Sequence, residues 1–195
     1  MLHRIFLAIN LPDNIKRKLI SLKDKWIEIP ARWTKEPNLH VTLLFLGNLD
    51  DNQLSQTIKV IQEVTTRHTS FVLNLRKVCF GPTDEKNSGK MPRMIWVEGE
   101  GENKLLQLQQ DLDKTIFNLE SFQYKERDEK PFKFHITLAR IKQWEFKKLE
   151  EIPKIDEEIN LKFEANTFEL MESQLKKGGP EYTILESFEL SGEEN

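Results

Sequence analysis

Two segments of the sequence share a strand pattern that is unusual because each carries a histidine and a threonine. Apolar residues alternate with polar ones in NLHVTLLFLG, residues 38–47, and again in PFKFHITLAR, residues 131–140. Alternation with a period of two is typical of a β-strand that has one face on a core. The first strand is expected to stop at Gly47. The expected core faces consist of Leu39, Val41, Leu43 and Phe45 in the first segment and of Phe132, Phe134, Ile136 and Leu138 in the second.

The opposite faces of these strands carry the polar residues that constrain the fold. Side chains two positions apart share a face, so His40 lies beside Thr42 and His135 beside Thr137. The two histidines are 95 residues apart, about half of the 195-residue chain. This spacing indicates a diverged duplication, with two lobes that each contribute one such strand. If a pseudo-twofold axis relates the lobes, the two His-Thr pairs face each other across a cleft.

The remaining segments predict strands and helices in an order that does not alternate strictly. Strands are expected over residues 3–10, 71–80, 93–99, 162–173 and 182–190, and helices from Pro12 to Trp26, from Asp50 or Asp51 to Thr65 and over residues 105–119. Loops are expected over residues 30–37 and 81–92, a turn over residues 174–181, and a loop or short helix over residues 145–160. The predicted fold class is therefore α+β rather than a purely parallel sheet.

Composition places the chain among globular proteins and excludes several classes. Hydrophobic residues make up 38% and charged residues 31%. The single cysteine, Cys79, is expected in the core and allows no intramolecular disulfide, and the four histidines have no zinc-site spacing. No apolar run approaches the roughly 20 residues of a membrane span, and the first residues do not resemble a signal peptide. A cytoplasmic location is the resulting expectation.

Charge is distributed unevenly along the chain. The net charge is −3, yet residues 4–35 contain eight Lys or Arg against three Asp or Glu, and acidic residues dominate after Glu150. A basic half that binds phosphate and two solvated faces of opposite sign both fit this pattern.

Two histidines and two hydroxyl groups around one cleft suit chemistry at phosphorus. One neutral imidazole can accept a proton while a charged one donates a proton, because imidazole titrates near neutral pH. Threonine hydroxyls can donate hydrogen bonds to phosphate oxygens. The sequence has no carboxylate cluster typical of a two-metal phosphatase and no GxxxxGK[ST] motif. In-line displacement at phosphorus, with a base on one side and an acid on the other, is the predicted reaction.

Paired His-x-Thr motifs are the signature of the 2H phosphoesterase superfamily, which this sequence resembles over nearly its whole length. Within it, the chain looks like the RNA 2′,3′-cyclic phosphodiesterases, the bacterial and archaeal 2′-5′ RNA ligase-like proteins. Besides the two motif strands, the matching stretches are RIFLAINLP, RW before the first motif, PRMIWV, and ESQLKKGGPEYTIL. One departure is Phe134, where members often have a proline directly before the second histidine.

The resemblance implies a fold, a reaction and roles for the motif residues. It implies one bilobal domain over residues 1–195, with two pseudo-twofold-related lobes of mostly antiparallel sheet, helices outside and a central cleft. It implies hydrolysis of RNA 2′,3′-cyclic phosphate ends to 2′-phosphate without metal or cofactor, and reversible 2′-5′ ligation. His40 would be the proton donor and His135 the proton acceptor, with Thr42 and Thr137 holding the phosphate. The implied partner is RNA with a cyclic phosphate end, tRNA-like fragments included, and a monomer is the default expectation.

Further residues are candidates for substrate contacts. Arg140 is expected to reach a phosphate from the His135 face of its strand, and Phe6 to stack on a base or pack in the core. Lys176 and Tyr182 flank a basic glycine-rich turn that suits a nucleotide. His3 and His68 are expected to be incidental surface residues. The four tryptophans are expected in the core: Trp26, Trp33, Trp96 and Trp144.

Two alternatives to an enzyme acting on cyclic-ended RNA stay open at this point. The same site would suit a small cyclic nucleotide or a 2′-5′ oligonucleotide. A non-catalytic RNA-binding module would use the basic half and the cleft. The two complete His-Thr pairs argue against a pure binder, because binding alone needs no titratable pair.

Overall fold

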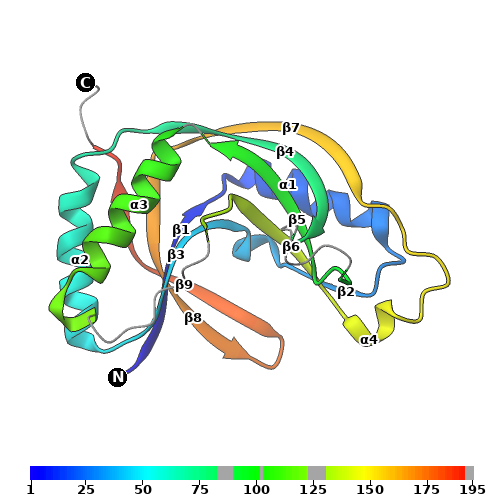
Figure 1. The fold of residues 1–195 in the computed structure, drawn as a ribbon, viewed down its shortest axis with the longest axis horizontal. Helices are drawn as coiled ribbons and strands as arrows, with labels where there is room; N and C mark the ends of the chain where they lie inside the picture. The colour runs from blue at the N-terminus through cyan, green and yellow to red at the C-terminus, as the bar shows by residue number, and fades with distance from the viewer. Residues whose placement is uncertain (83–89, 102, 123–130, 192–195) are drawn as a thin grey trace.

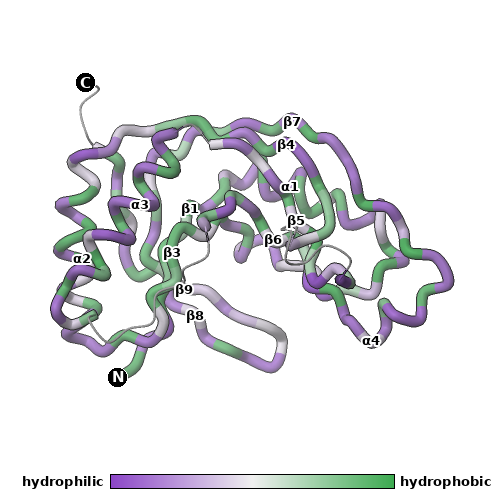
Figure 2. The backbone as a smooth tube through the Cα atoms, viewed as in Figure 1, coloured by the Kyte–Doolittle hydropathy of each residue, from purple (hydrophilic) through white to green (hydrophobic). Residues whose placement is uncertain are grey.

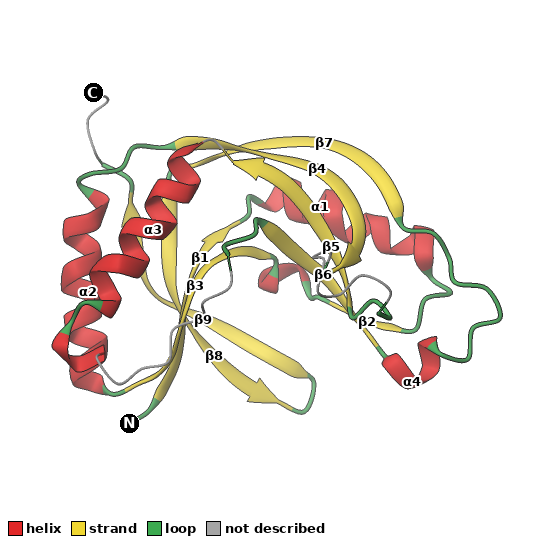
Figure 3. Ribbon diagram, in the orientation of Figure 1, coloured by secondary structure: helices red, strands yellow, loops and turns green. Residues whose placement is uncertain are grey.

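Two curved antiparallel sheets form the framework of the molecule (Figures 1 and 3). The computed structural model describes residues 1–82, 90–101, 103–122 and 131–191. The first sheet has the strand order β3-β1-β8-β9 and the second has the order β2-β6-β5-β4-β7. The strands are β1 (His3–Asn10), β2 (Ala31–Trp33), β3 (His40–Leu49), β4 (Phe71–Gly81), β5 (Met94–Gly101), β6 (His135–Ile141), β7 (Asp156–Ala165), β8 (Thr167–Lys176) and β9 (Gly179–Glu189). The two motif strands, β3 and β6, thus belong to different sheets, and the predicted α+β class is confirmed.

Two of the helices begin where the sequence signals predict, after Pro12 and after Asp50. The helix α1 (Asp13–Ser21) follows Pro12 and continues as a 3₁₀ turn over Leu22–Trp26. The Asp50 side chain accepts a hydrogen bond from Gln53 N and caps α2 (Asp51–Thr65), while the Gln53 side chain accepts one from Asp50 N. This reciprocal pair satisfies two N–H groups at the start of the helix. The remaining helices are α3 (Asn103–Phe117), which lies beside α2 in Figure 1, and the short α4 (Gln143–Phe146).

Buried apolar side chains from both sheets join in one core. Val41 and Leu43 of β3, Ile136 and Leu138 of β6, and Ile61 of α2 belong to it. Figure 2 shows apolar and polar residues alternating along the strands and helices, as expected for elements with one buried face. The core therefore anchors both motif strands by their apolar sides.

Several element boundaries differ from the sequence prediction. Residues 30–37 were expected as a loop, but Ala31–Trp33 forms β2 and pairs with β6. A strand of three residues is too short to show an alternation of polar and apolar residues. It can therefore be recognised only from its pairing with β6. The strand expected over residues 162–173 is two strands, β7 and β8, which separate at Asn166.

Other boundaries move by a few residues. The strand β3 continues past Gly47 to Leu49, because Gly47 takes a φ of 74° inside an irregular stretch of the β1–β3 pairing. The strand β6 begins only at His135. Residues 145–160 contain the end of α4 and the start of β7. In the predicted loop 81–92, Gly81 still belongs to β4, and residues 83–89 lie outside the described part of the chain.

Both motif strands carry a β-bulge at the third residue after the histidine. In β3, Leu7 pairs with Leu44 and Ala8 with Thr42, so Leu43 has no partner of its own. In β6, Ile95 pairs with Ala139 and Trp96 with Thr137, so Leu138 is the extra residue. An extra residue reverses the alternation of faces beyond it. The two bulges therefore decide which later side chains join the histidines.

One of these side chains contradicts the predicted core face. Phe45 was assigned to the core with Leu43, but it is 63% exposed and lines the same cleft as His40. The bulge at Leu43 explains the difference, because it turns Phe45 to the histidine side of β3. The predicted burial of Leu39, Val41 and Leu43 is confirmed.

Candidate active site

A cleft between the two sheets brings the four motif side chains together. It has a volume of about 680 Å³ and is lined by His40 and Thr42 from β3 and by His135 and Thr137 from β6. The tip of the β8–β9 hairpin and β2 supply further walls. The predicted meeting of the two His-Thr pairs in one cleft is thus found in the structure.

The imidazole of His40 is held at both nitrogens and covered by aromatic rings. Its Nδ1 donates to the carbonyl of Asn38 at 2.8 Å, and its Nε2 lies 3.0 Å from the Thr42 hydroxyl. The rings of Phe6 and Tyr182 lie with their centroids 5.1 and 5.3 Å from that of His40. Burial among these groups lowers the pKa of His40 to about 4, against an upward effect of the Asn38 carbonyl. His40 is therefore neutral at pH 7 in the free protein.

The imidazole of His135 has a hydrogen bond at Nδ1 like that of His40, but its ring packs against a different aromatic side chain. Its Nδ1 donates to the carbonyl of Lys133 at 2.9 Å. The ring stacks on Trp96 with a centroid distance of 4.0 Å and an interplanar angle of 26°. Burial lowers the pKa of His135 as well, and the charges of Lys133 and Arg140 act in the same direction.

The carbonyl contacts fix the same tautomer in both rings. A carbonyl oxygen only accepts hydrogen bonds, so each Nδ1 must carry a proton. In a neutral ring, Nε2 is then the basic nitrogen that takes up or releases a proton. Each motif thus presents Nε2 of its histidine for proton transfer, which is the arrangement a paired acid and base require.

The charged side chains that line the cleft around these histidines are cations. Among the described residues that line the cleft, four are basic and none is Asp or Glu; the four are Arg4, Arg32, Lys35 and Arg140. Such a cleft attracts an anion and suits a phosphate group.

The predicted substrate-contact residues divide into three that reach the cleft and one that does not. Phe6, Tyr182 and Arg140 line it. Phe6 is only 3% exposed and lies against His40, so it both packs and borders the site. Lys176 lies at the end of β8, is not among the cleft-lining residues, and forms an ion pair with Glu181 instead.

The position of Arg140 has a different cause from the one expected. Arg140 is five residues after His135, and strict alternation would have placed the two on opposite faces. Simple alternation along the strand therefore does not explain why Arg140 lies on the histidine side. The bulge at Leu138 reverses the alternation and brings Arg140 back to the histidine side.

Sequence reasoning missed several residues of the site. Arg32, Lys35 and the Thr34 hydroxyl, which donates to the Thr137 carbonyl at 2.8 Å, lie in the segment expected to be a loop. The Asn38 amide donates to the carbonyl of Pro180 at 2.8 Å and ties the β8–β9 hairpin to the first motif. Arg32 and Thr34 reach the site because β2 pairs with β6, and no local sequence pattern predicts this pairing.

The other histidines and the tryptophans also differ in part from expectation. His3 contacts Glu172 and Asp51, and His68 contacts Asp111; neither lines the cleft. Trp26 and Trp96 are buried as expected. Trp33 is partly buried against the core and also lines the cleft. Trp144 is 70% exposed beside Lys148, so the core prediction was wrong for Trp144.

The described residues show no metal site and no membrane-spanning helix. No three His, Cys, Asp or Glu side chains there gather in a way that would hold a metal ion. No helix over the described residues is long and apolar enough to cross a membrane. Cys79 is buried as predicted, and burial raises the pKa of its thiol to about 11.

Comparison with known proteins agrees with the fold. Residues 9–89 and 95–182 match the family described as LigT like Phosphoesterase. The chain is 31% identical to the RNA 2′,3′-cyclic phosphodiesterase of Thermus thermophilus over 97% of this chain and 91% of that protein. It is 30% identical to the protein of the same name from Aquifex aeolicus, over 87% of each chain.

Solved structures show the same architecture. TT0787 of Thermus thermophilus superposes with a TM-score of 0.81 at 28% identity, covering 98% of this chain and all of that one. Escherichia coli LigT, solved with 3′-AMP, superposes with a TM-score of 0.78 at 24% identity over 98% of this chain and 99% of that one. With a family match over most of the sequence and the two-sheet fold in common, the chain belongs to the LigT-like phosphoesterase family.

Proposed function

We propose that this protein hydrolyses the 2′,3′-cyclic phosphate end of RNA to a 2′-phosphate by acid–base catalysis with two histidines. The observation that carries the proposal is the pair of imidazoles in one cationic cleft, each with Nδ1 held by a carbonyl and Nε2 presented for proton transfer. Relatives covering most of the chain are named RNA 2′,3′-cyclic phosphodiesterases. Because the cleft needs both sheets, residues 1–195 would work as one bilobal domain.

In the proposed reaction, water attacks phosphorus from the side opposite the 3′-oxygen. Nε2 of His135 takes a proton from the water as the new P–O bond forms. The bond between phosphorus and the 3′-oxygen breaks, and His40 Nε2 delivers a proton to that oxygen. The products are a 3′-hydroxyl and a 2′-phosphate. The phosphate oxygens would be bound by Thr42, Thr137 and Arg140. Hydrogen-bond donors that are already in place before the reaction stabilise the charge on these oxygens most effectively.

The low pKa of His40 sets a condition for this assignment. A donor must be protonated when the substrate is bound, yet burial keeps His40 neutral in the free protein at pH 7. An anionic phosphate beside the ring favours the charged imidazole and raises its pKa. We therefore expect substrate binding to be accompanied by uptake of a proton at His40. The reverse reaction, 2′-5′ ligation of a cyclic end to a 5′-hydroxyl, would use the same groups with exchanged roles.

The deciding experiment incubates the purified protein with an RNA oligomer that ends in a 2′,3′-cyclic phosphate, with EDTA present, between pH 5 and pH 9. The expected result is conversion to a 2′-phosphate with a bell-shaped pH dependence of kcat/KM. A cyclic mononucleotide and a 2′-5′ dinucleotide tested in parallel distinguish the other substrates that suit the site. Salt-dependent RNA binding without turnover at any pH would contradict the proposal and favour a binding module.

A further inference from the structure

A second groove lies where β5 begins and β6 ends. It has a volume of about 560 Å³, and its walls include the cations Lys90, Arg93 and Lys147. Phe80 and Met91 add apolar surface. The groove and the cleft are lined by consecutive residues of the chain, since Arg93 lines the groove and Met94 lines the cleft.

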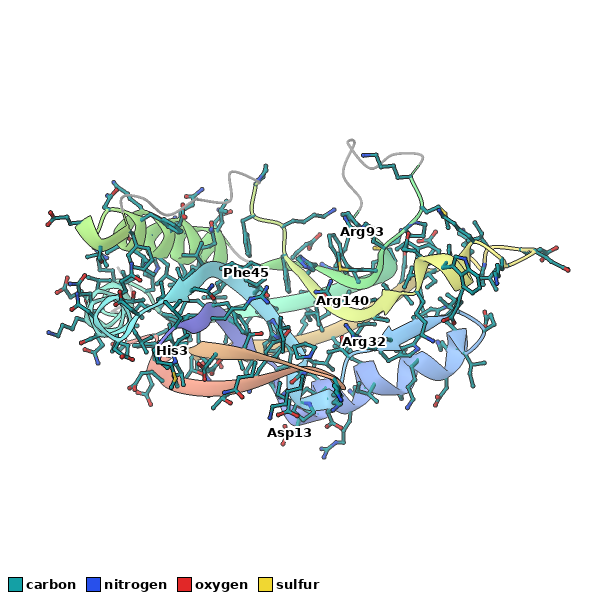
Figure 4. The ribbon with its side chains drawn as sticks, turned by 90° about the horizontal axis from the view of Figure 1, so that it is seen from below. His3, Asp13, Arg32, Phe45, Arg93 and Arg140 are labelled. Carbon is teal, nitrogen blue, oxygen red and sulfur yellow. The ribbon has the colours of Figure 1, made fainter. Side chains whose placement is uncertain are left out.

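Three arginines form a row that leads from the cleft to this groove. Arg32 of β2 is the direct cross-strand partner of Arg140 in β6, and Arg140 is the partner of Met94 in β5. The carbonyl of Arg93 accepts a hydrogen bond from Ile141 N at 3.0 Å. Figure 4 shows Arg32, Arg140 and Arg93 one after the other across these strands. Strand spacing makes the row about 10 Å long.

Within the part of the chain that the structure describes, the cations of this row form no ion pair, and the guanidinium of Arg140 donates only to the Met94 sulfur, at 3.8 Å. Like charges that lie directly opposite on neighbouring strands destabilise a sheet, yet Arg32 and Arg140 are so paired. Within the described ranges, no carboxylate lies within 4.0 Å of the basic groups of Arg32, Arg140, Arg93 or Lys147. Glu145, two residues before Lys147, pairs with Lys142 instead. A ligand with several successive negative charges would offset the repulsion.

The surface between the cations suits nucleobases. Phe80 is only partly buried, and its ring contacts Phe146 edge-on at 5.9 Å, which holds it in place. Cations alternating with aromatic and apolar side chains along a groove are typical of single-stranded nucleic-acid sites, where phosphates meet the cations and bases stack.

We propose that the arginine row and the second groove bind the nucleotides that precede the cyclic phosphate, so that the protein prefers an oligonucleotide end over a cyclic mononucleotide. This inference rests on the proposed function, because it uses the cyclic end to fix the direction of the strand. The terminal phosphate lies at the histidines, and the upstream backbone crosses Arg140 and Arg93 to reach Lys147.

The test compares two double variants that remove the same charge. Arg93→Gln/Lys147→Gln removes two cations of the groove, and Arg17→Gln/Lys162→Gln removes two exposed cations that lie outside both the cleft and the groove. For each protein, kcat/KM is measured on a ten-nucleotide RNA with a 2′,3′-cyclic end and on a cyclic mononucleotide, over a range of salt concentrations.

We expect the groove variant to lose about tenfold of the preference for the long substrate. The dependence of log kcat/KM on log salt should become shallower by about 1.4 with the long RNA, since each lost contact to a single strand removes about 0.7. The control variant should keep the wild-type preference and slope. An unchanged preference in the groove variant, or an equal loss on both substrates, would overturn the inference. Failure of the wild-type protein to convert either substrate would instead contradict the proposed function.

Discussion

The two halves of the cleft are built alike around their histidines. In β3 and in β6 the histidine Nδ1 donates a hydrogen bond to the backbone carbonyl of the residue two positions earlier. Both strands then carry a bulge three residues after the histidine. The shared backbone geometry leaves Nε2 as the basic nitrogen of each neutral ring.

The surroundings of the two rings differ. His40 packs against the rings of Phe6 and Tyr182 and touches Thr42, whereas His135 stacks flat on Trp96. Burial dominates both pKa values, but only that of His40 falls as low as about 4. The side chain brought back to the cleft by the bulge also differs.

That side chain is Phe45 in one half and Arg140 in the other, each five residues after its histidine. One half therefore adds an apolar ring and the other a charge. The comparison teaches that the two strands hold their histidines by the same backbone contact, while the side chains around each ring give the two halves of the cleft different chemical character.

The largest expected effect comes from removing either ring. His40→Ala and His135→Ala should each lower kcat by at least 100-fold, because a general acid or base contributes roughly 10²–10⁴-fold, or about 3–5 kcal/mol of barrier. Steady-state turnover of cyclic-ended RNA measures this, with circular dichroism to verify folding. His68→Ala, outside the cleft, is the matched control. Near-normal turnover in either cleft variant would refute a paired acid and base.

The second prediction concerns stability at acidic pH and separates the two histidines. The unfolded chain takes up a proton at each histidine near pH 6.5, but folded His40 resists protonation until about pH 4. Stability should therefore be unaffected by His40 above pH 6.5 and fall as the pH drops toward 4, by about 3 kcal/mol in total. Urea unfolding at pH 7 and pH 4 measures the difference.

Carboxylates also titrate in this range, so the comparison is made against variants. His40→Asn should remove about 3 kcal/mol of the acid-induced loss of stability. His135→Asn should act in the same direction, since burial lowers that pKa too. If wild type and His40→Asn lost equal stability on acidification, the buried neutral state of His40 would be excluded.

A feature of this site was predictable where residues close together in the sequence determine it, and not where pairing with a distant strand determines it. The motif strands and the capped helix α2 follow from local sequence signals, and the meeting of the His-Thr pairs follows from the two matching motifs half a chain apart. The bulges do not, because Leu43 and Leu138 are ordinary apolar residues in an apolar strand. Each of these leucines is an extra residue only because it has no partner in the neighbouring strand, where the pairing passes directly between Leu7 and Ala8 or between Ile95 and Trp96.

The same limit explains the other differences. The strand β2 has three residues and is stabilised by pairing with β6, so its arginine enters the site through a long-range contact. The Trp96–His135 stack likewise depends on β5 lying beside β6. Sequence periodicity describes one strand at a time, and each missed residue is positioned by a neighbouring strand.

The third prediction contrasts the two side chains that the bulges bring into the cleft. Arg140→Gln should lower kcat/KM by about 10- to 100-fold, since a hydrogen bond to a charged group contributes about 1.5–3 kcal/mol. Phe45→Ala should cost only about fivefold, through lost contact with a base. Arg140→Lys should recover part of the loss. A larger loss for Phe45→Ala than for Arg140→Gln would reverse the roles assigned to the two halves.

The smallest expected effect distinguishes the two threonines. Thr42→Val and Thr137→Val should each lower kcat/KM by about tenfold, because each removes one neutral hydrogen-bond donor to the phosphate. Only the Thr42 hydroxyl touches its histidine, at 3.0 Å; no hydrogen bond to the Thr137 hydroxyl is found among the residues that the structure describes.

The proton affinities of the rings should reveal this difference directly. The bond from a charged imidazole to the Thr42 oxygen is stronger than the bond to the neutral ring, so its loss penalises the charged form. Thr42→Val should thus lower the pKa of His40 further, whereas Thr137→Val should leave that of His135 in place. NMR titration of the two imidazoles in each variant, with Thr→Ser as the control that keeps the hydroxyl, measures both shifts. Equal shifts in the two halves would mean that the threonines act on their histidines alike, and that the difference between the halves lies in the aromatic rings alone.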